Sequence, residues 1–424
     1  MKKLLYLVLD GAPDRLVDEV TSLEKAYKPG LDSLAKKAKG GVVYTIAKGI
    51  APESDAAVLS ILGYDPYRDY TGRGPLEALG AGVKIKEGYE VAFRANFATV
   101  DKNTLRIIDR RCGRDLTSDE ANELAKAVDN LDLGIYDGYA RVVATVGHRA
   151  IVVIGSKTYK LSDNVENTDP AYKRHGKLSV AVKDFEMKIA VCKPLDDTFE
   201  AKITAELVNT FTRKVIEILD DHPVNRERVK KGKLKANAIL MRDAGIRFPR
   251  VENINKKFNR KFASIVEMPV ERGIALLLGM YDEKVPPPSE DKKADYELRL
   301  DKTLKLLKDY DVVYVHLKGP DEPGHDGEFE GKVKSIELID KYYVQPLIKN
   351  IDLREVAILV TSDHATPWIL KAHSDDPVPF MIVTEGFKPD NLNRFTEKEC
   401  YNKGGLGIIE HGWLLLPKVL ELIS

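Results

Sequence analysis

Acidic and histidine side chains at the ends of apolar runs are the residues of this sequence that could do chemistry. In the segment VHLKGPDEPGHDG, residues 315–327, Asp321 precedes His325 by four positions. That spacing would put both side chains on one face of a helix, but Pro323 and Gly324 lie between them and disfavour a helix interior. We therefore expect the pair on a loop, where a bound metal ion could hold an Asp and a His together.

Similar side chains follow two other apolar runs. Asp10 ends LLYLVLD, Asp363 and His364 end VAILVTSDH, and His373 follows in AHSDDPVP. A carboxylate after a strand is commonly a turn or capping residue, and a single Asp-x-x-x-His pair can arise by chance. A metal site explains all of these residues together better than separate turns do. Mixed Asp and His ligands suit Mn²⁺, Zn²⁺ or Mg²⁺, and they are numerous enough for two ions.

A serine offers a nucleophile for such a site. Ser54 follows Pro52 in GIAPESDAAVLSILGYD, at the expected start of a helix. The free N–H groups and the dipole at a helix start favour an anion or a phosphate, and a nearby metal ion would lower the pKa of the serine hydroxyl. Taken alone, Ser54 reads as a helix cap with Glu53 and Asp55 beside it. Beside a metal site, the nucleophile is the better interpretation.

Basic side chains could bind the phosphate or carboxylate groups of a substrate. Arginine suits this task because its planar fork bonds two oxygens at once, although most arginines only keep a protein surface soluble. The candidates are Arg73, Arg94, Arg110, Arg111, Arg114, Arg149 and Lys318. The segment DRRCGR lies in the middle of the chain, which suggests that this part holds the non-reacting end of the substrate.

Strands and helices alternate at both ends of the chain. Apolar runs typical of buried strands occupy residues 4–10, 40–46, 261–268, 311–317, 356–363 and 378–384. Helical patterns occupy residues 31–38, 54–65, 299–309 and 332–350. This alternation predicts an α/β core with a mostly parallel sheet between helices. The carboxyl ends of its strands would share one rim, where Asp10, Asp321 and Asp363 would meet.

The middle of the chain has a different pattern. Longer alternating strands are expected at residues 89–101, 141–155 and 185–194, with a helix at 118–131. We expect an inserted α+β domain at 84–235, and a discontinuous core made of 1–83 and 236–424.

The composition of the chain limits the partners and the cellular compartment that can be expected. The 424 residues carry 66 Lys and Arg against 66 Asp and Glu, which argues against nucleic acid and acidic membranes as partners. The start MKKLLYLVLDG is too short in its apolar run for a signal peptide, and no stretch is long enough to span a membrane. Three separated cysteines indicate a reducing compartment, so we expect a cytoplasmic protein. The charged content of 31% and the single glutamine are typical of a thermophile.

Several segments together carry a resemblance to a known family. Asp10, Ser54, Asp321 with His325, Asp363 with His364, and His373 resemble, in this order, the alkaline phosphatase superfamily. More narrowly, LDGAPDR, SDAAVLSILGYDP, TGRGPLEALGAG, DEPGHDG and TSDHATP resemble the archaeal-type 2,3-bisphosphoglycerate-independent phosphoglycerate mutases. The likeness covers nearly the whole chain and implies an alkaline-phosphatase-like core with an insert.

The resemblance also implies a site and a reaction. One metal ion is bound by Asp321, His325 and His373, and the other by Asp10, Asp363 and His364, with Ser54 Oγ as nucleophile at its open position. The implied reaction interconverts 3-phosphoglycerate and 2-phosphoglycerate, a step of glycolysis and gluconeogenesis, through a phosphoserine and without 2,3-bisphosphoglycerate. Mn²⁺ is the expected ion, with Mg²⁺, Co²⁺ or Zn²⁺ as alternatives. The expected partner is a small phosphoglycerate, and a homo-oligomer is left open.

This chain departs from the bacterial branch of the family at two points, and three alternative functions remain beside the mutase. The bacterial branch has Asn before its serine where this chain has Glu53, and its substrate-binding arginines do not align with this insert. The nearest alternative is another activity of the superfamily: a phosphatase, a phosphodiesterase or a phosphopentomutase. A second alternative, of a different class, is a non-catalytic metal-dependent binding protein. The third alternative is a nucleic-acid-binding protein, which the zero net charge disfavours. His411 is given no role.

Overall fold

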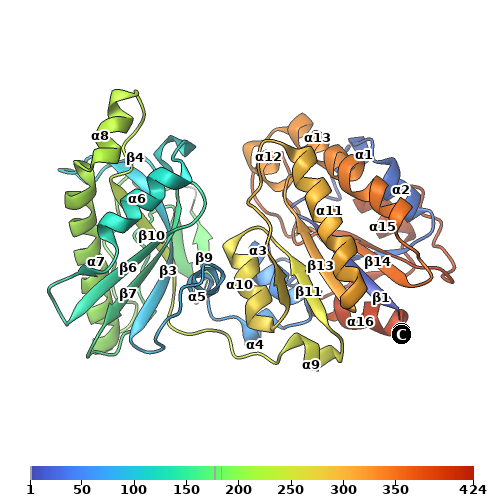
Figure 1. Ribbon diagram of the computed structural model, residues 1–424, viewed down its shortest axis with the longest axis horizontal. Coiled ribbons are helices and arrows are strands. Elements are labelled where there is room, and N and C mark those ends of the chain that lie inside the picture. Colours follow the sequence, from blue (N-terminus) through green and yellow to red (C-terminus); the bar gives the residue numbers. More distant parts are fainter. Residues whose placement is uncertain (1, 176–177, 183) are drawn as a thin grey trace. The chain divides into compact units, whose positions relative to one another are not determined.

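The computed structural model describes residues 2–175, 178–182 and 184–424, and the chain divides into two compact units (Figure 1). Unit 1 comprises Met1–Tyr70 and Arg250–Ser424, and unit 2 comprises Thr71–Pro249. The insert expected at 84–235 lies within unit 2, which extends beyond it at both ends. Arg73, which the sequence assigns to the core, therefore belongs to unit 2.

Unit 1 is built on an eight-stranded sheet with the order β12-β11-β13-β1-β14-β15-β2-β16. The strand β15 pairs antiparallel with β14 and with β2, whereas the other pairs are parallel. The mostly parallel sheet is thus confirmed. The strands are β1 Lys3–Leu9, β2 Lys39–Val43, β11 Phe262–Ile265, β12 Tyr281–Glu283, β13 Val312–Leu317, β14 Val356–Thr361, β15 Val378–Val383 and β16 Ile408–Ile409.

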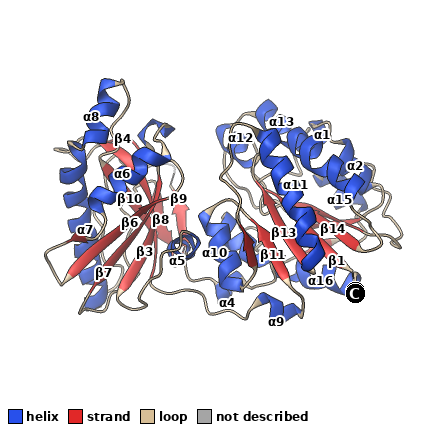
Figure 2. Cartoon of the chain, viewed as in Figure 1, coloured by secondary structure: helices blue, strands red, loops and turns tan. Residues whose placement is uncertain are grey.

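Helices cover both faces of this sheet (Figure 2). Leu5 and Leu7 of β1 belong to an apolar core with residues of α2, α11 and α13, whereas the Tyr6 hydroxyl donates to the Ile61 carbonyl of α3 at 3.0 Å. The helices are α1 Ser22–Lys25, α2 Pro29–Ala35, α3 Ser54–Ile61, α4 Pro66–Asp69, α9 Ile254–Phe258, α10 Pro269–Leu278, α11 Lys292–Asp309, α12 Asp321–Asp326, α13 Phe329–Ile339, α14 Gln345–Asn350, α15 Glu397–Lys403 and α16 Leu415–Leu422, with a π turn at Asp340–Val344 and a 3-10 turn at Gly412–Leu414.

Asp321 and His325 lie in the short helix α12, so the expectation of a loop is wrong. Pro323 is the third residue of this helix, where its missing N–H would have no acceptor within the helix in any case. Gly327 ends the helix with a φ of 79°. The proline therefore fits the first turn, and the four-residue spacing does put Asp321 and His325 on one face.

Unit 2 is an α+β unit with an antiparallel sheet in the order β10-β3-β7-β6-β5, and β4 pairs with β3. A separate ribbon joins β8 and β9. The strands are β3 Glu90–Val100, β4 Ile107–Asp109, β5 Leu131–Asp132, β6 Gly138–Ala144, β7 Arg149–Ser156, β8 Tyr172–His175, β9 Leu178–Ala181 and β10 Ala238–Gly245. The helices are α5 Arg73–Gly80, α6 Ser118–Val128, α7 Phe199–Asp220 and α8 Pro223–Lys230, with a 3-10 turn at Cys112–Arg114.

The two faces of this sheet are covered differently. Phe93 and Phe97 of β3 join an apolar core with residues of α6 and α7, whereas Ala92 packs on the other face with Ala78 of α5. The strand expected at 185–194 is not formed, because this segment makes only isolated bridges through Lys188 and Pro194. Among the described helices, none is long and apolar enough to cross a membrane.

Candidate active site

Three neighbouring strands deliver the acidic residues to one rim of the sheet in unit 1. The central strand β1 pairs in parallel with β13 and with β14. Asp10 follows β1 directly, Asp321 begins α12 just after β13, and Asp363 and His364 follow β14. Because parallel strands end at the same edge, residues more than 300 positions apart in sequence meet there.

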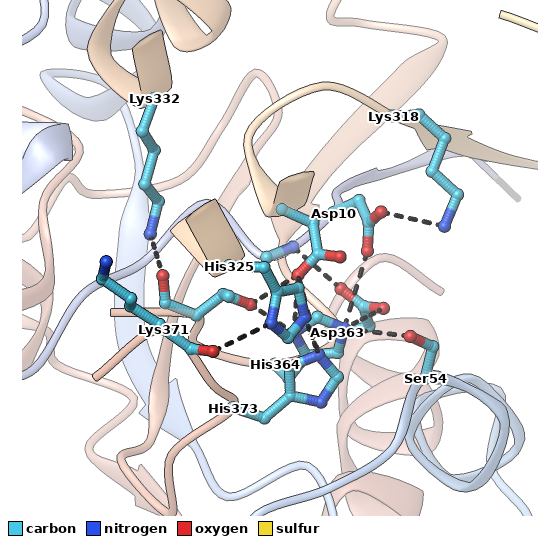
Figure 3. A network of polar contacts seen from close by, with 12 residues as sticks. Asp10, Ser54, Lys318, His325, Lys332, Asp363, His364, Lys371 and His373 are labelled. Carbon is cyan, nitrogen blue, oxygen red and sulfur yellow. Dashed lines mark hydrogen bonds and ion pairs between the residues drawn. The ribbon is translucent and has the colours of Figure 1, made fainter. Parts of the chain in front are cut away.

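The side chains form two clusters whose potential ligand atoms lie within 4.8 Å of one another (Figure 3). The first cluster contains Asp321, His325 and His373, with 3.1 Å between the two Nε2 atoms and 3.5 and 3.6 Å from these atoms to Asp321 Oδ1. The second cluster contains Asp10, Asp363 and His364. In this cluster His364 Nε2 lies 3.1 Å from Asp363 Oδ2 and 3.6 Å from Asp10 Oδ1.

Hydrogen bonds on the outer side of the first cluster orient its histidines. His325 Nδ1 lies 3.2 Å from the Lys371 carbonyl oxygen, and His373 Nδ1 lies 2.6 Å from the Pro52 carbonyl oxygen. A carbonyl only accepts, so each Nδ1 carries a hydrogen, and when the rings are neutral the lone pairs of both Nε2 atoms point toward each other. Two facing lone pairs and a carboxylate oxygen form a donor set that fits a divalent cation.

The charge balance of the first cluster also favours a cation. Burial lowers the pKa of His373, but its hydrogen bond to Asp321 and the charges of Glu53 and Asp321 raise that pKa to about 9. Burial and Asp10 raise the pKa of Asp321, yet His373 and His364 bring that pKa below its ordinary value. The carboxylates therefore draw positive charge into the cluster, either as protons or as a metal ion.

The second cluster contains buried atoms that need a partner. Among the described residues, Asp10 Oδ1 and Asp363 Oδ2 make no hydrogen bond although both side chains are buried. A buried carboxylate oxygen without a hydrogen bond is costly. The Nε2 atoms of His316 and His364 lie 3.1 to 3.6 Å from these two oxygens, and this set of donor atoms fits a metal ion. The residues of both clusters are thus suited to hold metal ions.

Ser54 is the first residue of α3 and faces the second cluster (Figure 3). Its Oγ lies 3.0 Å from His364 Nε2. Since His364 Nε2 is also close to Asp363 Oδ2, the serine hydroxyl stands at the edge of this donor set. The expected place of Ser54 at a helix start is found, and its neighbour Pro52 holds His373 of the other cluster through its carbonyl.

Lys318, a sequence candidate for phosphate binding, contacts Asp10 of the second cluster. It follows β13, and its Nζ lies 2.9 Å from Asp10 Oδ2 and forms an ion pair with Glu271 of α10. Burial raises the pKa of Asp10, but Lys318 and the neighbouring His316 and His364 hold that pKa well below its ordinary value. The lysine thus occupies one oxygen of Asp10 and leaves the other facing Asp363 and His364.

The arginine candidates lie in unit 2, where three of them surround one carboxylate. Arg73 Nε of α5 lies 2.6 Å from Glu77 Oε1, and Arg94 Nε of β3 lies 3.4 Å from the same oxygen. Arg149 of β7 also lowers the pKa of Glu77 by its charge, although burial raises that pKa. Burial and the charges of Arg73 and Arg242 lower the pKa of Arg94 to about 9. Such a concentration of positive charge is suited to an anion.

The DRRCGR arginines differ in their partners. Arg110 forms a bidentate ion pair with Asp169, with N–O distances of 3.0 and 2.8 Å, so its guanidinium group already binds a carboxylate of the protein. Arg111 and Arg114 lie at the turn after β4 and, together with burial and Arg149, lower the pKa of His148 to about 4. They therefore contribute to the positive region that contains Arg149.

Sequence reasoning missed Arg242, Glu77 and Thr366. Arg242 of β10 stands directly opposite Arg94 in the antiparallel register, and its guanidinium lies 3.7 Å from the centre of the Tyr172 ring. A charged residue in the otherwise apolar run AILMRDAG was the available signal. Thr366 contacts both clusters of unit 1, and its position two residues after His364 was the only hint in the sequence.

Comparisons with known proteins agree with this geometry. The family model described as 2,3-bisphosphoglycerate-independent phosphoglycerate mutase matches residues 35–225. An Aeropyrum pernix protein named 2,3-bisphosphoglycerate-independent phosphoglycerate mutase is 48% identical over 425 residues and covers 100% of each chain. An Archaeoglobus fulgidus protein named 2,3-bisphosphoglycerate-independent phosphoglycerate mutase 1 is 41% identical over 99% of this chain and 98% of its own.

Solved structures give the same result. The cofactor-independent phosphoglycerate mutase from Thermoplasma acidophilum is 32% identical, with a TM-score of 0.61 over 100% of both chains. A Pyrococcus horikoshii protein is 29% identical, with a TM-score of 0.76 over 100% of this chain and 97% of its own. The chain therefore belongs to the family of 2,3-bisphosphoglycerate-independent phosphoglycerate mutases.

Proposed function

We propose that this protein interconverts 3-phosphoglycerate and 2-phosphoglycerate without 2,3-bisphosphoglycerate, as the names of its relatives suggest. The observation that carries the proposal is the position of Ser54. Its hydroxyl lies at a helix start, 3.0 Å from His364 Nε2 of a cluster whose buried carboxylate oxygens include two that make no hydrogen bond within the described residues. A nucleophile in this place is suited to phosphoryl transfer.

Ser54 acts as the phosphoryl carrier in this proposal. Its Oγ attacks the phosphorus of 3-phosphoglycerate, the bond from phosphorus to the 3-oxygen breaks, and the serine proton is balanced by the proton that this oxygen gains. The 2-hydroxyl of the retained glycerate then attacks the phosphoserine and restores the serine hydroxyl. Two divalent cations held by Asp321, His325 and His373 and by Asp10, Asp363 and His364 would activate the hydroxyl and stabilise the anionic oxygens.

We further propose that arginines of unit 2 bind the substrate. We assign Arg94, Arg149 and the neighbouring Arg111 and Arg114 to the carboxylate end of the substrate. Besides burial, the charges of all four lower the pKa of His148, so their positive charge is concentrated in one region. Guanidinium groups bond carboxylates through two parallel hydrogen bonds, which fixes orientation as well as charge. Mn²⁺ is the proposed ion, and the reaction belongs to glycolysis and gluconeogenesis in the cytoplasm.

Phosphorus NMR of metal-stripped protein tests the proposal. The protein receives 3-phosphoglycerate and Mn²⁺ but no 2,3-bisphosphoglycerate, and a growing signal of 2-phosphoglycerate is expected. Ser54→Ala should abolish that signal. Ser60→Ala is a matched control, because it removes from the same helix a buried hydroxyl that has no hydrogen-bond partner in the described part of the chain.

The alternatives give different spectra. Free phosphate in place of 2-phosphoglycerate, lost in Ser54→Ala, would make the protein a phosphatase that uses the same nucleophile. Unchanged 3-phosphoglycerate in protein that has bound Mn²⁺ would refute the mutase and leave a metal-dependent binding protein or a different phosphate ester as substrate.

A further inference from the structure

Thr366 is the one residue whose hydroxyl, within the described residues, contacts a member of each cluster. Its Oγ1 donates to Asp321 Oδ1 at 2.7 Å and lies 3.0 Å from His364 Nδ1. The side chain is completely buried. Asp321 belongs to the first cluster and His364 to the second, so a single hydroxyl joins the two sets of ligands.

The protons of this pair of hydrogen bonds can be assigned. A threonine hydroxyl has one hydrogen, and an ionised carboxylate can only accept, so the hydroxyl hydrogen points to Asp321. The contact with His364 must then run from Nδ1–H to the threonine oxygen. This arrangement leaves the lone pair of His364 Nε2 directed to Asp10, Asp363 and Ser54. The hydrogen bond to Asp321 therefore also selects the tautomer of His364.

The backbone of Thr366 is fixed by the loop after β1. Its N–H donates to the Pro13 carbonyl at 3.0 Å, and its carbonyl accepts from Lys332 Nζ at 2.7 Å. Lys332 also binds the Pro13 carbonyl at 2.9 Å and Asp14 Oδ1 at 2.7 Å, and the side chains of Lys332 and Asp14 are both buried. The threonine is therefore held in place independently of the two ligands that it contacts.

The surroundings of Thr366 are tightly packed. A methyl group added at Gly11 would lie 2.6 Å from Thr366 Oγ1 and 2.6 Å from Asp321 Oδ1. One added at Gly324 of α12 would lie 2.6 Å from the Thr366 carbonyl oxygen. The segments that follow β1, β13 and β14 thus pack tightly against this residue, and its hydroxyl cannot turn to other partners without moving them.

We propose that Thr366 is a positioning residue that couples the two metal sites, because its hydroxyl orients Asp321 for one ion and His364 for the other. The proposal rests on the two-metal centre of the proposed function. Loss of the hydroxyl leaves a carboxylate oxygen and an imidazole N–H without their partner at the same time. Both ions should therefore bind more weakly, although Thr366 itself touches neither ion.

Mn²⁺ binding by the metal-stripped full chain, followed by calorimetry, tests this coupling. Wild-type protein should bind two ions per chain. Thr366→Val keeps the shape and removes the hydroxyl, and we expect each of the two affinities to fall by about 10- to 100-fold. Thr366→Ser keeps the hydroxyl and should restore both affinities. Thr303→Val is the matched control, since it removes a fully buried threonine hydroxyl of α11 that contacts Arg299 and Tyr343.

The outcomes separate this proposal from the proposed function. Two ions bound by wild-type protein with mutase activity would support the function, and the variants then decide the role of Thr366. Unchanged affinities in Thr366→Val, a loss at one site only, or a Thr366→Ser variant as weak as Thr366→Val would overturn the coupling. Fewer than two ions in wild type would overturn the two-metal centre and the coupling with it. If Thr366→Val does not fold, Thr366→Ala carries the same expectation.

Discussion

The ammonium group of Lys318 lies 2.9 Å from Asp10 Oδ2 and pairs with Glu271, so one lysine is shared by two buried carboxylates beside the proposed metal centre. This pairing leaves Asp10 Oδ1 as the oxygen that faces the Nε2 atoms of His316 and His364. The relationship explains how a cluster rich in acidic groups can be buried before any ion binds.

Replacement of Lys318 should therefore affect stability more than substrate binding. Lys318→Met leaves Asp10 and Glu271 without their cation, and we expect a loss of about 3–5 kcal/mol in the free energy of unfolding of the metal-free protein. The KM for 3-phosphoglycerate in the presence of Mn²⁺ should stay unchanged. Urea titrations and initial rates measure the two effects. A raised KM with unchanged stability would instead support the sequence interpretation, in which Lys318 binds substrate.

Metal binding should raise the thermal stability of the protein. An ion that binds only the folded chain adds about 2.7 kcal/mol per site at a concentration one hundred times its dissociation constant. Calorimetric melting in Mn²⁺ should therefore give a higher Tm than melting after chelation. His325→Ala, which damages one cluster, should show a smaller rise. Equal melting temperatures with and without Mn²⁺ would contradict the metal centre.

Two arginines of unit 2 should respond differently to replacement by lysine. Arg94 lies among several cations beside Glu77. Arg94→Lys replaces the two-pronged guanidinium group by a single ammonium group and should raise the KM for 3-phosphoglycerate about 10-fold, because the loss of one charged hydrogen bond has about this effect. Arg110 is held by both oxygens of Asp169, so Arg110→Lys should lower stability without changing KM. Initial-rate kinetics and urea titrations of both variants measure these effects, and the reverse pattern would remove Arg94 from the proposed binding site.

A buried carboxyl makes the stability of unit 1 depend on pH. Burial raises the pKa of Glu397 to about 7, although its hydrogen bonds from the Thr21 hydroxyl and the Asp14 N–H lower it. The folded state thus holds this proton more tightly than the unfolded chain, so ionisation costs stability as the pH rises from about 4.5 to about 7. Glu397→Gln should remove this cost. Its amide oxygen can still accept from the Asp14 N–H, whereas the contact with Thr21 must reverse, with the amide N–H donating to the threonine oxygen.

The stability difference between Glu397→Gln and wild type should therefore grow with pH and level off above pH 7. Its slope cannot exceed about 1.4 kcal/mol per pH unit for one proton. Urea titrations at several pH values measure this difference, and other titrating groups cancel because both proteins contain them. Two parallel stability curves would show that Glu397 is ionised in the folded protein throughout this range.

The sequence was most informative where local pattern and topology agree. Asp10 and Asp363 each end an apolar run, and the parallel order β13-β1-β14 brings them together as expected. Pro323 misled the interpretation of α12, because proline breaks a helix interior but not a first turn. The partners of Lys318 and the contact of Thr366 depend on α10 and α12, which no local pattern places beside the metal centre.

The boundaries of the inserted domain could not be predicted from the local sequence either. The segment that forms α5 looks like an end of the first part of the chain, yet it packs on β3 and β10 of unit 2. Its Gly74 lies so close to β3 that an added methyl group would stand 2.2 Å from the Ala92 carbonyl oxygen. Such a contact between distant segments becomes visible only when the fold is known.

The position of β1 has a consequence for synthesis of the chain on the ribosome. This strand is translated long before its two neighbours in the sheet, β13 and β14, which begin at Val312 and Val356. All of unit 2 is translated between them, so it can fold while the apolar strand Lys3–Leu9 still waits for partners. The strand β1 therefore stays without its partners until β13 and β14 have emerged, and the candidate active site can be assembled only after that point.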